Sequence, residues 1–210
     1  MTSISATEQA DLIATAHALA DAARAATLLH FRRPGLTADN KEAERFDPVT
    51  VADRLSEEHM RAILADRRPQ DAILGEEYGT KPGTSGLTWV LDPIDGTRGY
   101  LSGTPTWGVL IAVGDASGPL YGVIDQPYIR ERFEGGFGRA EVNGPMGRTL
   151  LQARPARPLS EAIVMTTFPE VGTAEEGAAF RRVASRARLV RYGTDCYAII
   201  CGQAHIRVRH

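Results

Sequence analysis

The stretch from Trp89 to Tyr100 constrains the fold of this chain more than any other, because an apolar run there ends in two carboxylates. Residues 89–91 (WVL) predict a short buried strand, and Asp92 and Asp95 follow it at once. Pro93 between the two acids fixes its own φ and offers no N–H, so we expect the strand to stop there. The pattern predicts a strand that opens into a tight acidic turn.

A helix is expected directly after this turn. Gly96 permits a positive φ or a close backbone approach, and Thr97 is a favourable N-cap residue. Asp92 and Asp95 can then converge on a hard cation, while unpaired N–H groups at the helix start face an anion. A cation and an oxyanion held in one turn indicate phosphate chemistry.

The composition argues against several classes of function. With 210 residues, 43% of them hydrophobic, the chain can bury a large core as one large domain or two small ones. A net charge of -2 without a dense Lys/Arg run argues against nucleic acid as a partner. Cys196 and Cys201 give no disulfide framework, and the N-terminal residues lack a secretory signal pattern. The longest uncharged stretch, Gly99–Gly114, is broken by Pro105 and is shorter than the ~18 apolar residues of a membrane span. We therefore expect a cytoplasmic protein that does not enter a membrane.

Two helices are predicted in the N-terminal part of the chain. Apolar residues at helical spacing indicate one helix from about Thr7 to Phe31 and another from about Val51 to Arg67. The polar residues 36–50 between them indicate a loop or a hairpin. Thr50 with Asp53 three residues later resembles a capping box, so Asp53 is either a first-turn helix acid or part of a site.

A second predicted strand also ends in acids. Residues 71–77 (DAILGEE) repeat the design of the first strand, an apolar run followed directly by a carboxylate. We therefore expect Glu76 to share one sheet edge with Asp92 and Asp95. Carboxylates clustered in this way repel one another unless a cation lies among them. Three oxygen donors without His or Cys favour Mg²⁺, Mn²⁺ or Ca²⁺ over zinc, and Mg²⁺ with a phosphate substrate fits best. An EF-hand is excluded, because the twelfth position from Asp92 is Gly103 and not Glu.

Strands and helices alternate through the rest of the chain. Further strands are expected over residues 106–113, 120–125, 131–138, 139–152, 163–167 and 189–192. Further helices are expected over residues 174–187 and about 196–204, the last one after a turn at 193–195. The architecture indicated is layered α and β, with an antiparallel middle.

Three acidic motifs, in this order, resemble the inositol monophosphatase superfamily: DPVTVAD at 47–53, ILGEE at 73–77 and WVLDPIDGT at 89–97. The resemblance runs from about residue 10 to about residue 206. It implies the layered αβαβα sandwich of inositol monophosphatases and fructose bisphosphatases. Residues 1–150 would carry the metal and phosphate site, and residues 151–210 would carry substrate contacts. It also implies Mg²⁺-dependent hydrolysis of a small phosphomonoester, with Mn²⁺ as a substitute, lithium inhibition and a homodimer.

The resemblance also assigns metal ligands, position by position. Glu76, Asp92 and the backbone carbonyl of Ile94 would hold a first metal ion. Asp92 and Asp95 would hold a second one. A bound metal lowers the pKa of water enough to supply hydroxide near neutral pH, and a second one stabilises the leaving alkoxide of an in-line displacement. No covalent phosphoenzyme is needed.

The same resemblance assigns catalytic and phosphate-binding roles. Thr97, paired with Asp53, would orient the attacking water, with Glu76 assisting as a base. The N–H groups of Gly96 and Thr97 would bind phosphate oxygens at the helix start.

Finer features resemble the histidinol-phosphatase branch of the superfamily, namely DGTR at 95–98, SGTPTWG at 102–108, GVIDQPY at 122–128 and GTDCY at 193–197. Asp195 matches a position that contacts the alcohol part of the substrate, where a carboxylate would suit the amine of histidinol. Arg98 is either a substrate contact or a solvated helix charge. We therefore expect hydrolysis of L-histidinol phosphate in histidine synthesis, with inositol monophosphate or a related ester as the near alternative.

The chain departs from the family at its C-terminal end. Family members continue past the last helix, where a Trp-Asp motif supplies a third carboxylate to the second metal. The only tryptophans here are Trp89 and Trp107, and the sequence ends at His210. We expect a C-terminally incomplete fold in which the second metal binds weakly or only with substrate. Two other classes therefore stay open: a catalytically impaired remnant that binds metal or phosphate, and a structural or regulatory partner of a full-length relative.

The remaining cysteines, histidines and lysines are weaker candidates for a site. Cys196, Cys201, His205 and His210 lack the spacing of a zinc finger, and small residues on a core helix explain the cysteines better. Lys41 lies in the polar segment where the family often has a lysine near the metal, and a solvated loop charge explains it equally well.

Overall fold

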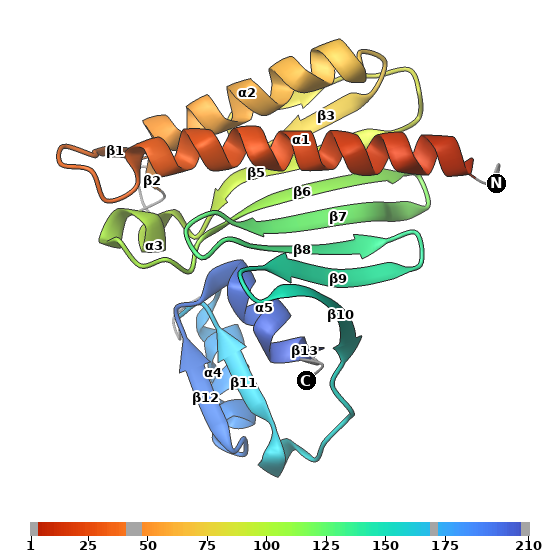
Figure 1. Cartoon of the computed structure of the whole chain (residues 1–210). Coiled ribbons are helices and arrows are strands. Elements are labelled where there is room, and N and C mark those ends of the chain that lie inside the picture. The colour runs from red at the N-terminus through yellow and green to blue at the C-terminus, as the bar shows by residue number, and fades with distance from the viewer. Residues whose placement is uncertain (1–3, 41–47, 169–171, 207–210) are drawn as a thin grey trace.

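Two long helices cover one face of a large sheet. The computed structural model describes residues 4–40, 48–168 and 172–206. Helices α1 (Ala6–His30) and α2 (Val51–Arg67) lie side by side over the sheet (Figure 1), and these bounds confirm both predicted helices. The core beneath them is formed by buried apolar side chains, among them Leu12, Leu19, Met60, Leu64, Trp89, Ile111 and Val123.

Among the described residues, the central sheet has nine strands in the order β13-β10-β9-β8-β7-β6-β5-β3-β4. The strand bounds are β3 (Ala72–Gly75), β4 (Gly79–Lys81), β5 (Thr88–Asp95), β6 (Gly108–Asp115), β7 (Gly118–Gln126), β8 (Glu131–Gly136), β9 (Arg139–Gly144), β10 (Gly147–Ala153) and β13 (Ala204–Ile206). Strands β3 and β5 are parallel, and their other neighbours in the sheet are antiparallel to them. The C-terminal ends of β3 and β5 therefore meet at one edge.

A smaller layer lies below this sheet in Figure 1. Strands β11 (Ile163–Thr166) and β12 (Leu189–Tyr192) form a parallel pair, and the 3₁₀ helix η1 (Leu159–Glu161) precedes them. Helix α5 (Asp195–Gln203) lies between this pair and the large sheet, and α4 (Ala174–Ala184) packs on the pair through Phe180 against Tyr192. The order of helix, sheet, helix, sheet and helix is the layered fold predicted from the sequence.

The boundary expected between the two parts of the chain does not divide the large sheet from the rest. The division expected at residues 150 and 151 falls inside β10. Strand β13, from the C-terminal part, pairs antiparallel with β10. The large sheet is therefore built from both parts of the chain.

The segment expected to be a loop or a hairpin is paired at its ends. Strand β1 (Ala38–Asn40) runs antiparallel to β2 (Pro48–Thr50), which supports the hairpin interpretation. Lys41 lies outside the described residues.

Two expectations at the acidic turn were wrong. Strand β5 does not stop at Pro93 but continues to Asp95, with a break in its register against β6 between Asp92 and Asp95. The irregularity absorbs the missing donor of the proline. The N-cap of the short helix α3 (Thr97–Ser102) is Gly96, with φ of 90°, and Thr97 is the first helical residue. A left-handed conformation at the cap favours glycine there over a side-chain cap.

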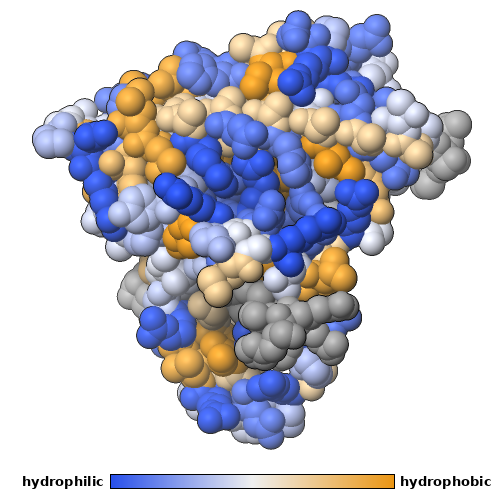
Figure 2. Space-filling view, in the orientation of Figure 1, coloured by the Kyte–Doolittle hydropathy of each residue, from blue (hydrophilic) through white to orange (hydrophobic). Residues whose placement is uncertain are grey.

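A second charged region lies on the helix side of the sheet. Figure 2 shows hydrophilic residues gathered below α1, over the sheet. A cavity of about 590 Å³ opens there, and we call it the charged cleft. Its charged lining residues are His17, Asp21, Arg24, Arg130, Arg132, Glu134, Arg139, Glu141 and Arg148. Within the described part of the chain, none of the helices has the length and apolar character needed to cross a bilayer.

Candidate active site

The register of the parallel pair β3 and β5 brings two acids together. Gly75 lies opposite Leu91, and the N–H of Glu76 donates to the carbonyl of Leu91 at 3.1 Å. Glu76, directly after β3, and Asp92, within β5, therefore stand at the same level, and their carboxyl groups are hydrogen-bonded to each other. The sequence predicted this shared edge from the two strand-end acids alone.

Asp92 is the most constrained carboxyl group at this edge. Its Oδ1 is buried and has no hydrogen-bond partner among the described residues. Burial raises the pKa of Asp92 well above its usual range, and the carboxylates of Glu76, Asp95 and Asp53 raise that pKa further. A buried acceptor without a donor, surrounded by like charges, is unfavourable unless a cation neutralises it.

Asp95 follows the irregularity in β5 and is held from the other part of the molecule. Its Oδ2 accepts the backbone N–H of Cys196 at 2.7 Å, in the first turn of α5. The thiol of Cys196 is buried beside it, and burial together with the Asp95 charge raises the pKa of that thiol. Helix α5 therefore orients one of the predicted metal ligands.

Asp53 lies behind this edge at the start of α2. Its Oδ2 accepts the N–H of Thr50 at 2.8 Å and the hydroxyl of Thr50 at 2.5 Å, which completes the predicted capping box. Burial raises the pKa of Asp53, against the lowering effect of the Thr50 hydrogen bonds, and the Glu76 charge raises it too. Asp53 is thus a helix cap that also belongs electrostatically to the acidic group.

The expected pair between Thr97 and Asp53 is not formed between these two described residues. The hydroxyl of Thr97 donates instead to the carbonyl of Ile94 at 3.1 Å. A hydroxyl that donates its proton keeps its lone pairs as acceptors. Thr97 can therefore still accept a hydrogen bond from a water molecule.

Asp195 approaches the acidic turn closely because residue 96 is glycine. A Cβ atom on Gly96 would lie 2.6 Å from Oδ2 of Asp195. Asp195 itself has φ of 41°, a left-handed conformation that is uncommon for residues other than glycine. Burial and the Asp95 charge raise its pKa, and Arg98 lowers it. The guanidinium of Arg98 also lies over the ring of Phe168, 5.0 Å from its centre. Both predicted substrate contacts thus lie near Gly96.

These residues fit a hard divalent cation chemically. Glu76, Asp92 and Asp95 offer carboxylate oxygens, and the unsatisfied Oδ1 of Asp92 is an acceptor that a cation would satisfy. Across the described residues, no three His, Cys, Asp or Glu side chains stand close enough as they are to enclose an ion.

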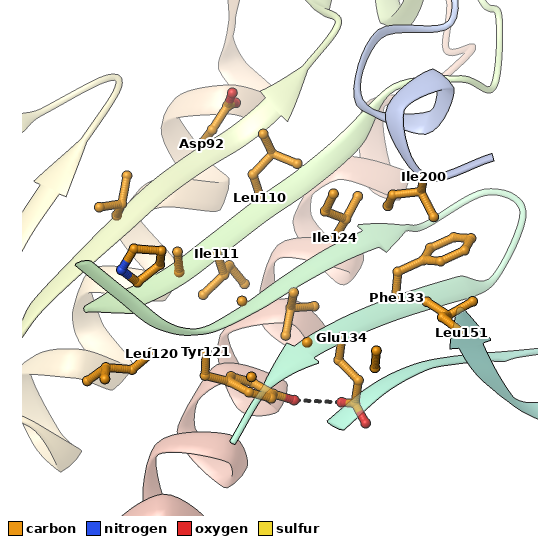
Figure 3. Close-up of a pocket in the computed structure, with 18 residues that line it drawn as sticks. Asp92, Leu110, Ile111, Leu120, Tyr121, Ile124, Phe133, Glu134, Leu151 and Ile200 are labelled. Carbon is orange, nitrogen blue, oxygen red and sulfur yellow. Dashed lines mark hydrogen bonds between the residues drawn. The ribbon is translucent and has the colours of Figure 1, made fainter. Parts of the chain in front are cut away.

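An apolar cavity of about 850 Å³ borders the acidic edge. Figure 3 shows Asp92 on β5 beside Leu110, with Ile124 and Ile200 further along the cavity. Apolar walls lower the local dielectric, which strengthens electrostatic interactions at Asp92.

Sequence reasoning missed two residues that hold the site together. Glu57 is fully buried and binds the turn that carries Glu76. Cys196 was considered only as a thiol, whereas its N–H binds Asp95. The spacing of Asp53 and Glu57 on one face of α2 was a usable signal for Glu57. A backbone donor such as that of Cys196 leaves no side-chain signal.

Comparisons with known proteins agree with this geometry. A sequence model of the inositol monophosphatase family matches residues 8–210. The bifunctional phosphatase IMPL2, chloroplastic, of Arabidopsis thaliana is 37% identical over 198 residues, which cover 93% of this chain and 55% of that protein. A histidinol-phosphatase of Streptomyces coelicolor is 40% identical over 127 residues, which cover 59% of this chain and 47% of that protein. The chain spans about half the length of these curated relatives.

A solved structure has the same arrangement of elements. An inositol monophosphatase from Zymomonas mobilis superimposes with a TM-score of 0.75 at 37% sequence identity. The match covers 92% of this chain and 72% of that one.

Proposed function

Because the chain belongs to the inositol monophosphatase family, we propose that it is a Mg²⁺-dependent phosphomonoesterase that hydrolyses L-histidinol phosphate to L-histidinol and phosphate. The observation that supports this proposal most directly is the meeting of Glu76 and Asp92 at one sheet edge, with Oδ1 of Asp92 buried and without a partner. Four histidinol-phosphatase motif segments and the similarity to a histidinol-phosphatase favour this substrate over other small esters.

In this proposal the acidic edge holds the metal. Glu76, Asp92 and the carbonyl of Ile94 would hold one Mg²⁺, and Asp92 with Asp95 would hold another, with Mn²⁺ as a substitute. Bound Mg²⁺ would offset the negative charge of the phosphate and make water a better nucleophile near neutral pH. The N–H of Cys196 holds the Asp95 carboxylate in place for this role.

The chain's own residues would place the water and the phosphate. The hydroxyl oxygen of Thr97, with its proton on the Ile94 carbonyl, would accept a hydrogen bond from the attacking water. The carboxylate of Glu76 would take up the proton that this water loses. Asp53 would add a further negative charge near the metal from the start of α2, and the N–H groups of Gly96 and Thr97 would bind phosphate oxygens.

Asp195 and Arg98 would bind the alcohol part of the substrate. The carboxylate of Asp195 lies against Gly96, next to the N–H groups proposed to bind the phosphate, so the alcohol part of the ester would lie beside it. A carboxylate at that position favours an alcohol that carries an ammonium group, as histidinol does. A neutral polyol such as inositol would gain less from it.

A panel of phosphomonoesters tests this proposal. We expect Mg²⁺-dependent phosphate release from L-histidinol phosphate to exceed that from inositol monophosphate. Good turnover of inositol phosphate beside none of histidinol phosphate would reject the substrate and favour the inositol monophosphatase alternative, which the Zymomonas mobilis match supports. Release from no ester would reject the enzymatic proposal.

The variant Asp195→Asn separates the two substrates. It removes the negative charge near Gly96 and keeps the size of the side chain. We expect kcat/KM to fall about 10- to 100-fold for histidinol phosphate, the range of a charge-assisted hydrogen bond, and less than about 3-fold for inositol monophosphate. Equal losses for both esters would show that Asp195 does not recognise the amine.

The finer expectations from the family belong to the same proposal. They are a role in histidine synthesis, inhibition by lithium, a homodimer and a cytoplasmic location.

A further inference from the structure

A buried carboxylate on α2 reaches the turn that carries Glu76. The side chain of Glu57 is fully buried. Its Oε2 accepts the N–H of Glu77 at 2.7 Å, and its Oε1 accepts the N–H of Tyr78 at 3.2 Å. Arg61, one helical turn later, donates to Oε1 at 2.7 Å and balances its charge. A buried carboxylate is tolerated only with such partners, so this arrangement is specific.

The turn is shaped to admit this carboxylate. A Cβ atom on Gly75 would lie 1.9 Å from Oε1 of Glu57, so any larger residue there would displace it. On the far side of the turn, Nη2 of Arg61 donates to the carbonyl of Gly79 at 2.5 Å. Glu57 and Arg61 together bind the backbone of the turn from Glu77 to Gly79.

Glu76 lies between two fixed points. On one side its N–H binds the carbonyl of Leu91 on β5 at 3.1 Å, and on the other side the next N–H, that of Glu77, is bound by Glu57. The Glu76 side chain is itself exposed at the edge, so packing does not hold it. Besides its hydrogen bond to Asp92, the direction of this side chain therefore depends on the backbone on either side.

We infer that Glu57 is a positioning residue of the active site, which holds the turn between β3 and β4 so that Glu76 faces Asp92 and can share a divalent cation with it. Glu57 acts through Glu76 and does not touch the substrate. The inference rests on the proposed function in that the cation is the one used for phosphate release. Helix α2 thus supports the acidic edge twice, through Asp53 at its first turn and through Glu57 one turn later.

The test measures Mg²⁺ affinity of the metal-free chain by calorimetry, in addition to phosphate release. We expect Glu57→Gln, which turns one acceptor oxygen into a donor, to weaken Mg²⁺ binding about 10- to 100-fold, as loss of a partner behind a metal ligand does. The matched control is Glu58→Gln. Glu58 contacts the same turn only through the hydroxyl of Tyr78, and its loss should leave Mg²⁺ affinity unchanged.

Double variants distinguish positioning from general stabilisation. Because Glu57 acts through Glu76, Glu57→Gln should add almost nothing to the loss of affinity caused by Glu76→Gln. By contrast, Glu57→Gln should add its full effect to the loss of affinity caused by Asp95→Asn, because Asp95 is held by α5 and not by Glu57. Full addition to both would show a merely structural role and overturn the inference.

A measurement on the unchanged chain covers the case in which Glu57→Gln does not fold. The amides of Glu77 and Tyr78 should exchange with deuterium slowly even without Mg²⁺, because Glu57 already binds them. Fast exchange without Mg²⁺ would overturn the inference, as would unchanged Mg²⁺ affinity in Glu57→Gln or a parent chain that binds no Mg²⁺.

If the parent chain binds Mg²⁺ through Glu76 and Glu57 but hydrolyses no ester, the proposed function fails while the positioning role stands. If the parent chain hydrolyses esters and Glu57→Gln binds Mg²⁺ normally, the positioning role fails while the proposed function stands.

Discussion

Two acid-rich regions of this molecule differ in whether their buried carboxylates are paired with arginines. Behind the charged cleft beneath α1, Asp125 is fully buried and accepts hydrogen bonds from two arginines that line the cleft, Arg24 at 2.6 and 3.0 Å and Arg132 at 2.7 Å. At the acidic edge, none of the ion pairs formed within the described residues involves Asp92 or Asp95. The cleft therefore supplies its own cations, whereas the described residues place none in an ion pair with Asp92 or Asp95.

The difference indicates which acids stabilise the fold and which are kept for function. Removing a buried carboxylate that is held by two arginines costs stability, because the arginines are then left as uncompensated charges. A buried carboxylate facing other carboxylates costs stability in the absence of a cation. Sites that violate the local rules of stability in this way are most often functional. We therefore propose that a cation binds at the acidic edge and that the charged cleft is a structural brace between α1 and the sheet.

The largest expected effect is that of Asp92→Asn at the acidic edge. Removing the carboxylate shared by both proposed metal ions should lower kcat/KM for the ester by at least about 10³-fold, or ~4 kcal/mol. The same change should raise the thermal stability of the metal-free chain by about 1–2 kcal/mol, because it removes a carboxyl group whose pKa is raised on folding, which costs stability at neutral pH. Phosphate release measures the expected fall in kcat/KM, and thermal unfolding without metal measures the expected rise in stability.

The control for this variant is Asp115→Asn. Asp115 lies at the opposite end of β6, where its Oδ1 accepts the N–H of Ser117 at 2.8 Å. Its replacement should leave kcat/KM unchanged. Loss of both activity and metal-free stability in Asp92→Asn would place Asp92 with the structural acids of the cleft and end the contrast between the two regions.

The acidic edge could be predicted from the sequence because its signals are local. Apolar runs that end in Glu76 and Asp92 predict strands, and two such strands of one sheet, if parallel, must end at the same edge. The start of α2 could also be predicted from the sequence, since Thr50 and Asp53 form their capping box within one turn. Both predictions needed no knowledge of distant contacts.

The charged cleft could not be predicted, because its pairs join residues far apart in the chain. Arg24 and Asp125 are 101 positions apart, and neither has a distinctive neighbourhood in the sequence. The same limit hid the bond from Cys196 to Asp95, also 101 positions apart. At the acidic turn, the wrong prediction concerned neighbouring residues and not a distant contact. Thr97 was expected as the cap, but the left-handed conformation at Gly96 moved the cap one residue back.

The next effect is expected for Asp125→Asn in the charged cleft. This change leaves Arg24 and Arg132 without their shared carboxylate in a mostly buried setting. We expect the free energy of unfolding to fall by about 3 kcal/mol, the range for breaking a buried ion pair. The kcat of the folded protein should stay within about 2-fold of the parent, since the side-chain partners of Asp125, Arg24 and Arg132, are not partners of the described acids at the edge. Chemical denaturation and initial rates measure the two quantities.

The exposed partner in the same network provides the control. Asp21 accepts a hydrogen bond from Arg132 at 2.7 Å, but its side chain is 69% exposed. Asp21→Asn should therefore cost less than about 0.5 kcal/mol. A large loss of kcat in Asp125→Asn, with little loss of stability, would contradict the assignment of the cleft as a structural brace.

The smallest expected effect concerns the pH dependence of the cleft. Burial alone would raise the pKa of Glu134, but hydrogen bonds from Glu141, Tyr121 and His17, with the His17 charge, lower it to about 2. A carboxylate whose folded pKa lies below its unfolded value stabilises the fold above that unfolded value, near 4.5. This contribution is lost as the pH falls from about 4.5 toward 2, because the unfolded chain then binds the proton more readily.

The variant Glu134→Gln should flatten this acid limb of the stability curve. Partial exposure screens the interactions of Glu134, so we expect the change in slope to correspond to less than about 1 kcal/mol between pH 4.5 and pH 2. Urea denaturation across that range measures it, with Glu161→Gln as a control, because Glu161 is exposed in η1 and its removal should leave the slope as it is. An acid limb in Glu134→Gln as steep as in the parent chain would mean that acid destabilisation arises outside the cleft. The acids of the cleft would then contribute to stability only through their arginines, as Asp125 does.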